Sequence, residues 1–329
     1  MEWNKRVKIQ FNITTSACDL NRFASREEFL DLRKDFDGVE LMVCGEDERG
    51  IIQPGDVVGL HMSCFYYWLD FWKGDLERCR EEFGTLDTAY ACYGGTDRQA
   101  LIDRFRTDLA HAKKYGAEYM VFHISDSSSL ETLTGRYAHT DEEVIDAACE
   151  LINQAMDGVT DDPMLLLENL WEPGLTLTRP EMTRRLLDGI RWPKKGIMLD
   201  TGHLLHTNLS LRTQKEGLEY IHRCLDAHGE LCRYIRGVHL NQSLTGSYMK
   251  QVRKQPPELS KDYGEKMGQL FEYVFQADQH KPFVCPGVRE LIDRIAPEYL
   301  TFEFISNDLE QHKTMLRRQR RALEKERET

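Results

Sequence analysis

Four ionisable residues stand at the ends of apolar segments in the second half of the chain. They are Glu168 in LLLEN, Asp200 in GIMLD, His239 in GVHL and Glu303 in LTFEF. An unpaired charge that follows an apolar run is costly to bury, and a divalent cation held between carboxylates removes that cost. Carboxylate oxygens and an imidazole nitrogen form a mixed donor set that suits Mn, Co, Zn or Mg. These residues therefore predict a site for one divalent metal ion.

Short apolar segments rich in Val, Ile, Leu and Phe alternate with helical patterns along the chain, which predicts parallel strands joined by helices. The expected strands cover residues 7–13, 38–43, 57–62, 118–124, 164–169, 196–200, 235–240 and 299–305. We expect one domain over residues 1–329 with the α/β fold of a (β/α)8 TIM barrel, and an open doubly wound sheet is the main alternative. In a closed barrel the carboxyl ends of the strands meet on one face, so the four ionisable residues converge there.

Two long insertions and a charged tail depart from the simple alternation. Residues 62–97 follow the third expected strand and are rich in aromatic side chains, and residues 241–286 follow the seventh. Loops of this length in a compact domain usually carry a function or a structure of their own. Because βα loops lie on the catalytic face of a barrel, we expect both insertions there. Residues 308–329 are predicted to form a charged terminal helix.

The charge and the motifs of the chain limit the classes of partner that we expect it to bind. The 329 residues carry 43 Lys and Arg against 55 Asp and Glu, a net charge of -12. Nucleic-acid binding depends largely on Lys and Arg, so we expect a small-molecule substrate and no nucleic-acid partner. No G-x-G-x-x-G follows the first strand and no G-x-x-x-x-G-K-[ST] occurs, which removes the usual support for nucleotide binding.

The redox and membrane signals point to a cytoplasmic protein. The chain has nine cysteines, and none of them forms a C-x-x-C pair, which predicts reduced thiols rather than a disulfide framework. The first residues contain no apolar signal segment, and no stretch of about 18 apolar residues occurs. We therefore expect no membrane partner.

The strand-end segments resemble those of the xylose-isomerase-like, or AP-endonuclease-family-2-like, TIM barrels, which include sugar isomerases and ketose 3-epimerases. The resemblance spans nearly the whole chain and is carried by LLLENLW, LDTGHLLHTN, GVHLNQS and YLTFEF. It implies a metal site made of Glu168, Asp200, His239 and Glu303. It also implies that Glu168 and Glu303 form the acid/base pair and that His203 contacts substrate oxygens. After His239 the chain reads LNQS, without the Asp or Lys often found there in the family. The family further suggests a homo-oligomer.

Five residues are candidates for substrate binding, namely His61, Trp68, His123, His203 and His280. Trp68 lies in an aromatic stretch that either packs internally or forms a wall against a sugar or aromatic substrate. His123 is either a pocket residue or a satisfied core histidine. The segment DQHKPF, which contains His280, either reaches over the pocket or is an ordinary polar loop. His61 either belongs to a wall that stacks on the substrate or is an ordinary polar loop residue. His203 either contacts the substrate or is a loop residue that is solvated or bonded to a metal ligand.

The expected chemistry is proton abstraction beside a carbonyl group. A divalent ion that chelates a carbonyl and an adjacent hydroxyl acidifies the carbon-bound proton and stabilises the enediolate. Glu168 and Glu303 on opposite faces of the reacting carbon would give epimerisation, whereas one base that returns the proton to the neighbouring carbon gives isomerisation. We therefore expect a metal-dependent sugar isomerase or epimerase of carbohydrate metabolism, with manganese among its candidate ions.

Three alternatives differ in reaction or in class. A lyase or dehydratase would use the same metal and expel a neighbouring hydroxyl group. A non-catalytic binding protein would be marked by the loss of a metal ligand, and none is lost here. A DNA-repair endonuclease of this superfamily would carry a larger three-metal, histidine-rich cluster and a basic face. We expect neither feature, because strand-end histidines are few and the net charge is negative.

Overall fold

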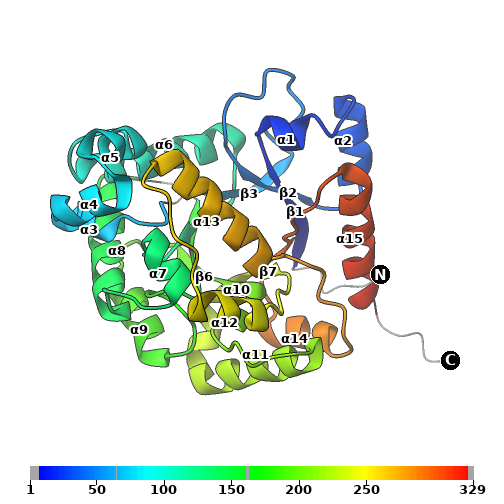
Figure 1. Ribbon diagram of the computed structural model, residues 1–329. Coiled ribbons are helices and arrows are strands. Elements are labelled where there is room, and N and C mark those ends of the chain that lie inside the picture. Colours follow the sequence, from blue (N-terminus) through cyan, green and yellow to red (C-terminus); the bar gives the residue numbers. More distant parts are fainter. Residues whose placement is uncertain (1–6, 64, 161–162, 325–329) are drawn as a thin grey trace.

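Eight parallel strands close into a barrel in the order of the sequence (Figure 1). The computed structural model describes residues 7–63, 65–160 and 163–324. The strands are β1 (Lys8–Thr14), β2 (Gly38–Met42), β3 (Val57–His61), β4 (Tyr119–His123), β5 (Met164–Glu168), β6 (Lys195–Asp200), β7 (Ile235–Leu240) and β8 (Tyr299–Phe302). The pairing of β1 with both β2 and β8 closes the sheet. The (β/α)8 barrel is confirmed, and the open sheet is excluded.

The last strand is shorter than expected. β8 ends at Phe302, whereas the apolar pattern continues to residue 305. Beyond that point the backbone bonds to a side chain of β1 instead of to a strand. The Phe304 amide donates to Oδ1 of Asn12 at 2.9 Å, and Nδ2 of Asn12 donates to the Phe304 carbonyl at 3.3 Å. Glu303 therefore leaves the ladder at the rim of the barrel.

Helices surround the barrel and cover its strand ends. They are α1 (Ala17–Leu20), α2 (Arg26–Arg33), α3 (Leu69–Lys73), α4 (Leu76–Phe83), α5 (Leu86–Tyr93), α6 (Gln99–Tyr115), α7 (Ser129–Thr134), α8 (Asp141–Ala155), α9 (Pro180–Gly189), α10 (Thr201–His206), α11 (Gln214–His228), the 3-10 helix η1 (Gly229–Tyr234), α12 (Gly246–Lys254), α13 (Tyr263–Ala277), α14 (Val288–Ile295) and α15 (Leu309–Ala322). α15 corresponds to the expected terminal helix, whose residues 325–329 lie outside the described part of the chain.

The two insertions fold as helices over the ends of the strands. The first contributes α3, α4 and α5, and the second contributes α12 and α13. α7 packs against both α12 and α13, and Figure 1 draws α13 in gold across the front of the barrel. The Lys266 ammonium donates to the Glu82 carbonyl, which joins the two insertions. The catalytic face expected of a barrel therefore lies beneath this helical cover.

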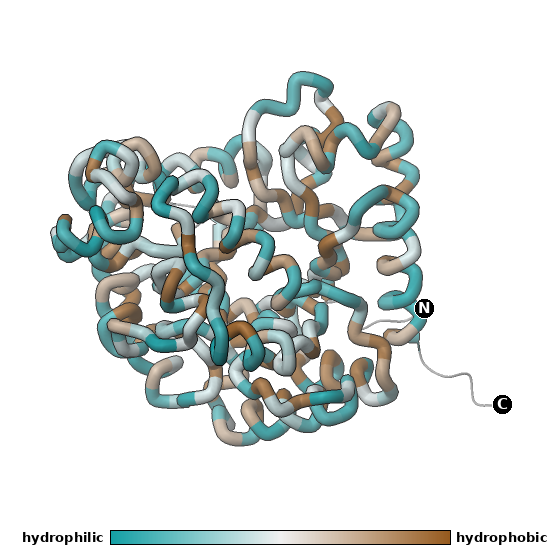
Figure 2. Tube along the Cα trace, viewed as in Figure 1, coloured by the Kyte–Doolittle hydropathy of each residue, from teal (hydrophilic) through white to brown (hydrophobic). Residues whose placement is uncertain are grey.

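The apolar core changes to a polar layer toward the strand ends. Most hydrophobic stretches of the chain lie inside and most hydrophilic ones outside (Figure 2). A small cluster of inward side chains consists of Val58, Tyr119, Val121, Leu166, Met198 and Tyr299. From this cluster the Tyr119 hydroxyl donates to the carboxylate of Glu40, which also accepts from Thr301 at 3.0 Å. The interior thus contains more ionisable side chains toward the carboxyl-terminal ends of the strands.

Two further expectations, on disulfides and on membrane-spanning segments, concern the described residues. Their cysteines are all free thiols, as the sequence predicts; Cys64 lies outside the described residues. Across the described ranges, no helix combines the length and the apolar character needed to cross a membrane.

Gly59 lies where the ring of Tyr119 crosses the barrel, and a Cβ added there would overlap that ring. We expect Gly59→Ala to lower the free energy of unfolding by about 1–3 kcal/mol, because the packed interior cannot absorb the extra carbon. Gly268→Ala in α13 is the control, since its added Cβ meets no atom within 4 Å. Alanine should stabilise that helix by about 0.5–1 kcal/mol. Urea unfolding measures both, and unchanged stability of Gly59→Ala would contradict this packing.

Candidate metal centre

The four residues predicted to bind a metal ion come together at the ends of β5 to β8. One ligand atom from each of Glu168, Asp200, His239 and Glu303 lies within 4.8 Å of the others. Strand register explains this, because Asp200 pairs with His239 across β6 and β7, and Glu303 directly follows β8. Nδ1 of His239 lies 3.1 Å from Oε1 of Glu168 and 3.3 Å from Oε2 of Glu303. We call these residues the first donor group.

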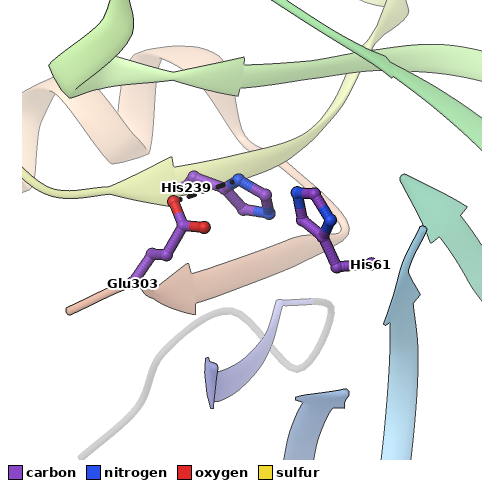
Figure 3. A group of neighbouring side chains, drawn as sticks. All are labelled: His61, His239 and Glu303. Atoms are coloured by element: carbon purple, nitrogen blue, oxygen red, sulfur yellow. Dashed lines mark ion pairs between the residues drawn. The ribbon is translucent and has the colours of Figure 1, made fainter. Parts of the chain in front are cut away.

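Two histidines form a second donor group on the other oxygen of Glu168. Nε2 of His61 lies 3.2 Å from Oε2 of Glu168, and Nε2 of His123 lies 3.1 Å from the same oxygen. Figure 3 shows the ring of His61 beside that of His239, whose Nδ1 faces Glu303. Each oxygen of Glu168 thus faces a different donor group, so this carboxylate could serve as a ligand in both.

The second insertion completes a third donor group. It consists of His203, Asp278 and His280. Oδ2 of Asp278 lies 3.1 Å from Nε2 of His203 and 2.6 Å from Nε2 of His280. Nδ1 of His203 lies 3.3 Å from Oε1 of Glu168, which links this group to the first. Of the two interpretations open for DQHKPF, the buried contacts favour a segment that reaches over the site.

The expectation that histidines are too few for a multinuclear site is therefore wrong. His61 and His123 end neighbouring strands and face Glu168. His203 lies in α10 and faces Glu168 and Asp278, and His280 lies in the second insertion and faces Asp278 and Glu303. They are far apart in the sequence, and only the closed barrel and the packing of α13 bring them together. The described residues thus offer donors for more than one ion.

Fixed tautomers aim the free nitrogens of the histidines at the carboxylates. Nδ1 of His61 bonds to the Met62 carbonyl at 2.9 Å, and Nδ1 of His203 bonds to the Asn169 carbonyl at 2.9 Å. A carbonyl oxygen only accepts, so these nitrogens carry the hydrogen, and the Nε2 atoms present lone pairs whenever the rings are neutral. A lone pair that faces a carboxylate oxygen is unfavourable unless a proton or a cation lies between them. The donor set therefore fits divalent ions.

Burial and mutual charge shift the pKa values of the carboxylates in opposite directions. Burial raises the pKa of Glu303 to about 8, although the charges of His239 and His280 oppose it. Burial also acts to raise the pKa of Glu168, but the charges of His239 and His123 outweigh it and hold this pKa well below its usual range. The two glutamates therefore differ in protonation near neutral pH.

The histidines of the first and third donor groups hold protons when no cation is bound. Burial acts to lower the pKa of His280, but the charges of Asp278 and Glu303 raise it to about 9. Burial also acts to lower the pKa of His239, and the charges of Glu303 and Glu40 raise it well above its usual range. His123 differs, because burial lowers its pKa despite the charge of Glu168. A cation must displace protons from this centre.

Three supporting residues hold the donors in position, and the sequence predicted none of these roles. Asn169 donates to the Asp200 carbonyl at 3.1 Å and accepts from the Asp200 amide at 2.9 Å, which ties β5 to β6. Asn241 donates to Oδ2 of Asp200 at 2.7 Å. Glu40 accepts from Nε2 of His239 at 3.0 Å. The sequence does contain a signal for the two asparagines, because Asn169 directly follows Glu168 and Asn241 lies two residues after His239.

The structure shows the contacts of two further residues, Glu40 and Trp68. The partners of Glu40 are His239, Tyr119 and Thr301. Trp68 belongs to none of the donor groups. Its indole N–H donates to the Ser125 carbonyl at 2.8 Å, and its ring packs edge-on against Trp72. Its role in substrate binding stays a prediction.

We expect zinc binding to release protons, because a nitrogen must lose its proton before it binds a metal. His280, with a pKa of about 9, is protonated at pH 7 in the absence of metal. Affinity for zinc should therefore rise as the pH increases toward 9 and fall as it decreases. Calorimetry at pH 7 in buffers of different ionisation enthalpy counts the protons released. Heats that do not depend on the buffer would contradict these pKa directions.

Glu40→Gln should weaken metal binding without removing a donor. The substitution removes the carboxylate that orients Nε2 of His239, and changes of this kind lower metal affinity about 10–100-fold. Competition with a chromophoric zinc chelator measures the effect, and Glu272→Gln at an exposed position of α13 is the control. Equal affinity of Glu40→Gln and wild type would show that His239 needs no such support.

Comparisons with known proteins agree with this architecture. Residues 77–291 match the family model described as xylose isomerase-like TIM barrel. No curated protein matches the chain. Endonuclease IV from Thermus thermophilus is 18% identical with a TM-score of 0.51, covering 96% of this chain and 98% of its own.

Two other solved structures are similar at lower identity. The probable 3-DHS dehydratase AsbF from Bacillus anthracis is 12% identical with a TM-score of 0.50, covering 95% of this chain and 98% of its own. The 3-keto-D-glucoside 4-epimerase YcjR from E. coli is 12% identical with a TM-score of 0.49, covering 96% and 99%. Identities this low show a common fold alone. The family match, which covers more than half of the sequence, assigns more: the chain belongs to the xylose isomerase-like TIM-barrel family.

Proposed function

We propose that this protein is a divalent-metal-dependent hydrolase that cleaves a phosphate ester of a small molecule. One observation carries the proposal: the second and third donor groups join the first through Glu168 and His203. Centres with two or more ions recur in phosphatases and nucleases. Bound ions would supply Lewis-acid polarisation of a phosphoryl oxygen and a nucleophile at neutral pH. The histidine-rich donor set favours zinc, and Mn, Co and Mg are the alternatives.

The protein side chains would hold, orient and shield the reacting group. Glu168 keeps the donor groups in register through its two oxygens. The side chain of His123 is 26% exposed, whereas those of His61 and His203 are 7% and 6% exposed. Substrate would therefore approach from the side of His123. The buried remainder of the centre excludes bulk water, which strengthens its electrostatic interactions.

A small molecule suits the charge of the chain better than a nucleic acid does. The net charge of -12 opposes a long phosphate backbone, whereas one phosphate group needs only the local positive charge of the centre. The donor groups would thus supply the multinuclear feature of a DNA-repair enzyme on a chain whose net charge is -12. A cytoplasmic location and a homo-oligomeric state stay predictions.

A sugar isomerase or epimerase is the second candidate, and the first donor group favours it. Glu168 and Glu303 both face Nδ1 of His239, and their pKa values are pushed apart, as suits an acid/base pair. One ion, with manganese among the candidates, would suffice for that reaction and for the related lyase reaction. Neither reaction gives a role to the third donor group, which is why we rank both second.

A single substitution separates hydrolysis from isomerisation. We expect the zinc-loaded protein to release phosphate from a panel of sugar phosphates and p-nitrophenyl phosphate. His280→Ala should lower that rate by about 10²–10³-fold, as expected when one group that stabilises developing charge is lost. His222→Ala, which removes a histidine of α11 outside the donor groups, should leave the rate unchanged.

Proton exchange provides the opposing test on the same samples. NMR in deuterated water detects deuterium entering a sugar beside its carbonyl group. Deuterium incorporation that persists in His280→Ala, together with no release of phosphate by the wild type, would contradict the hydrolase and support the isomerase.

A further inference from the structure

We propose that a buried polar cluster beside the third donor group binds the hydroxyl-bearing part of the substrate. The cluster consists of Tyr137, Trp171, Glu172, Arg253 and Tyr273, and we call it the Glu172 cluster. The inference rests on the proposed function, because it places the organic group of an ester whose phosphate lies at the metal centre. Arg253 and Tyr273 come from the second insertion, so these two members of the cluster belong to the elements added to the barrel.

Four polar atoms of the cluster are buried without a hydrogen bond of good geometry to a described residue, although the Arg253 guanidinium lies close enough to the Tyr273 phenol to oppose the rise in pKa that burial causes there. They are Oη of Tyr137, Nε1 of Trp171, Nε of Arg253 and Oη of Tyr273. Burying one such atom unpaired costs about 1–3 kcal/mol. Glu172 is only 5% exposed, and among the described residues its carboxylate bonds to its own backbone amide and to no other side chain. Such a concentration of unpaired groups indicates a partner from outside the chain.

The members of the cluster lie within electrostatic reach of one another. Burial raises the pKa of Glu172 to about 7, against the opposing charges of His203 and Arg253. Burial raises the pKa of Tyr137, and the charge of Glu172 adds to that effect. Trp171 packs against the apolar group that contains Tyr273. The helices α7, α12 and α13, which border or carry these residues, pack together over the barrel (Figure 1).

The cluster borders the metal centre directly. The ring of Trp171 packs edge-on against that of His203, with centroids 5.2 Å apart, and against that of His206 at 4.6 Å. Glu172 lies shortly after Glu168, in the loop that follows β5, and its pKa responds to the charges of His203 and Asp278. A substrate held at the third donor group therefore extends toward the Glu172 cluster.

The donor and acceptor types in the cluster favour a ligand with several hydroxyl groups. Trp171 and Arg253 only donate, Glu172 accepts, and the phenols of Tyr137 and Tyr273 do both. A hydroxyl group also donates and accepts, so a polyol chain or a sugar ring can satisfy all of these atoms. An apolar group would leave them unpaired, and a second anion would face the Glu172 carboxylate.

A matched pair of phosphonates tests this inference, because their C–P bond resists hydrolysis. The probes are 2,3,4-trihydroxybutylphosphonate and butylphosphonate, with inorganic phosphate as reference, and calorimetry measures their binding to the zinc-loaded full chain. We expect the trihydroxy compound to bind at least about tenfold more tightly than butylphosphonate, from the pairing of several buried groups. Tyr273→Phe and Glu172→Gln should each reduce that preference at least about threefold without changing the affinity for inorganic phosphate.

Tyr248→Phe is the matched control for the loss of a phenol hydroxyl. Tyr248 stacks on Tyr273 with ring centroids 5.8 Å apart, but its hydroxyl is not among the buried unpaired atoms, so the preference should persist in this variant. Equal affinity of the two phosphonates for the wild type would overturn the inference. A preference that survives both Tyr273→Phe and Glu172→Gln would also overturn it.

Failure of the proposed function gives a different result. In that case neither phosphonate nor inorganic phosphate binds to the zinc-loaded wild type. Saturation-transfer NMR with erythritol then tests whether the Glu172 cluster binds hydroxyl groups by itself. A signal that is present in the wild type and in Tyr248→Phe but lost in Tyr273→Phe supports hydroxyl binding, and the absence of any signal in the wild type overturns it.

Discussion

The buried carboxylate of Glu168 is the constraint around which the carboxyl-terminal end of the barrel strands is arranged. One of its oxygens faces His239 and His203, and the other faces His61 and His123. A charge buried this deeply costs several kcal/mol unless positive charge surrounds it. The strand register brings the histidines to it, and backbone carbonyls fix the tautomers of His61 and His203. Protons can satisfy part of this arrangement, and divalent ions would bind the oxygens and nitrogens that face one another.

The second insertion turns a simple barrel rim into a larger site. Its α13 ends next to Asp278 and His280, which complete the third donor group, and the same helix carries Tyr273 into the Glu172 cluster. One packed unit thus contributes both to the metal centre and to the proposed contact with the organic group of the substrate. Because α13 packs on α7 and joins the first insertion through Lys266, these donors stand on a rigid support rather than on a free loop.

The sequence predicts the barrel and the first donor group because both leave local signals. Glu168, Asp200, His239 and Glu303 each follow or interrupt an apolar run, and the period of those runs identifies the strands. Asp278 and His280 leave no such signal, since they lie in an irregular segment whose position depends on how α13 packs. The same holds for the support that Glu40 gives to His239 across the barrel. The number of donor groups is therefore a property of tertiary packing.

The number of bound ions tests the central claim most directly. Crystals of the protein grown with zinc allow an anomalous difference map to be recorded at the zinc absorption edge. We predict three peaks in each chain, one within each donor group, with Glu168 between the first and the second. A single peak among Glu168, Asp200, His239 and Glu303 would contradict a multinuclear centre and return the protein to the chemistry of a single metal ion.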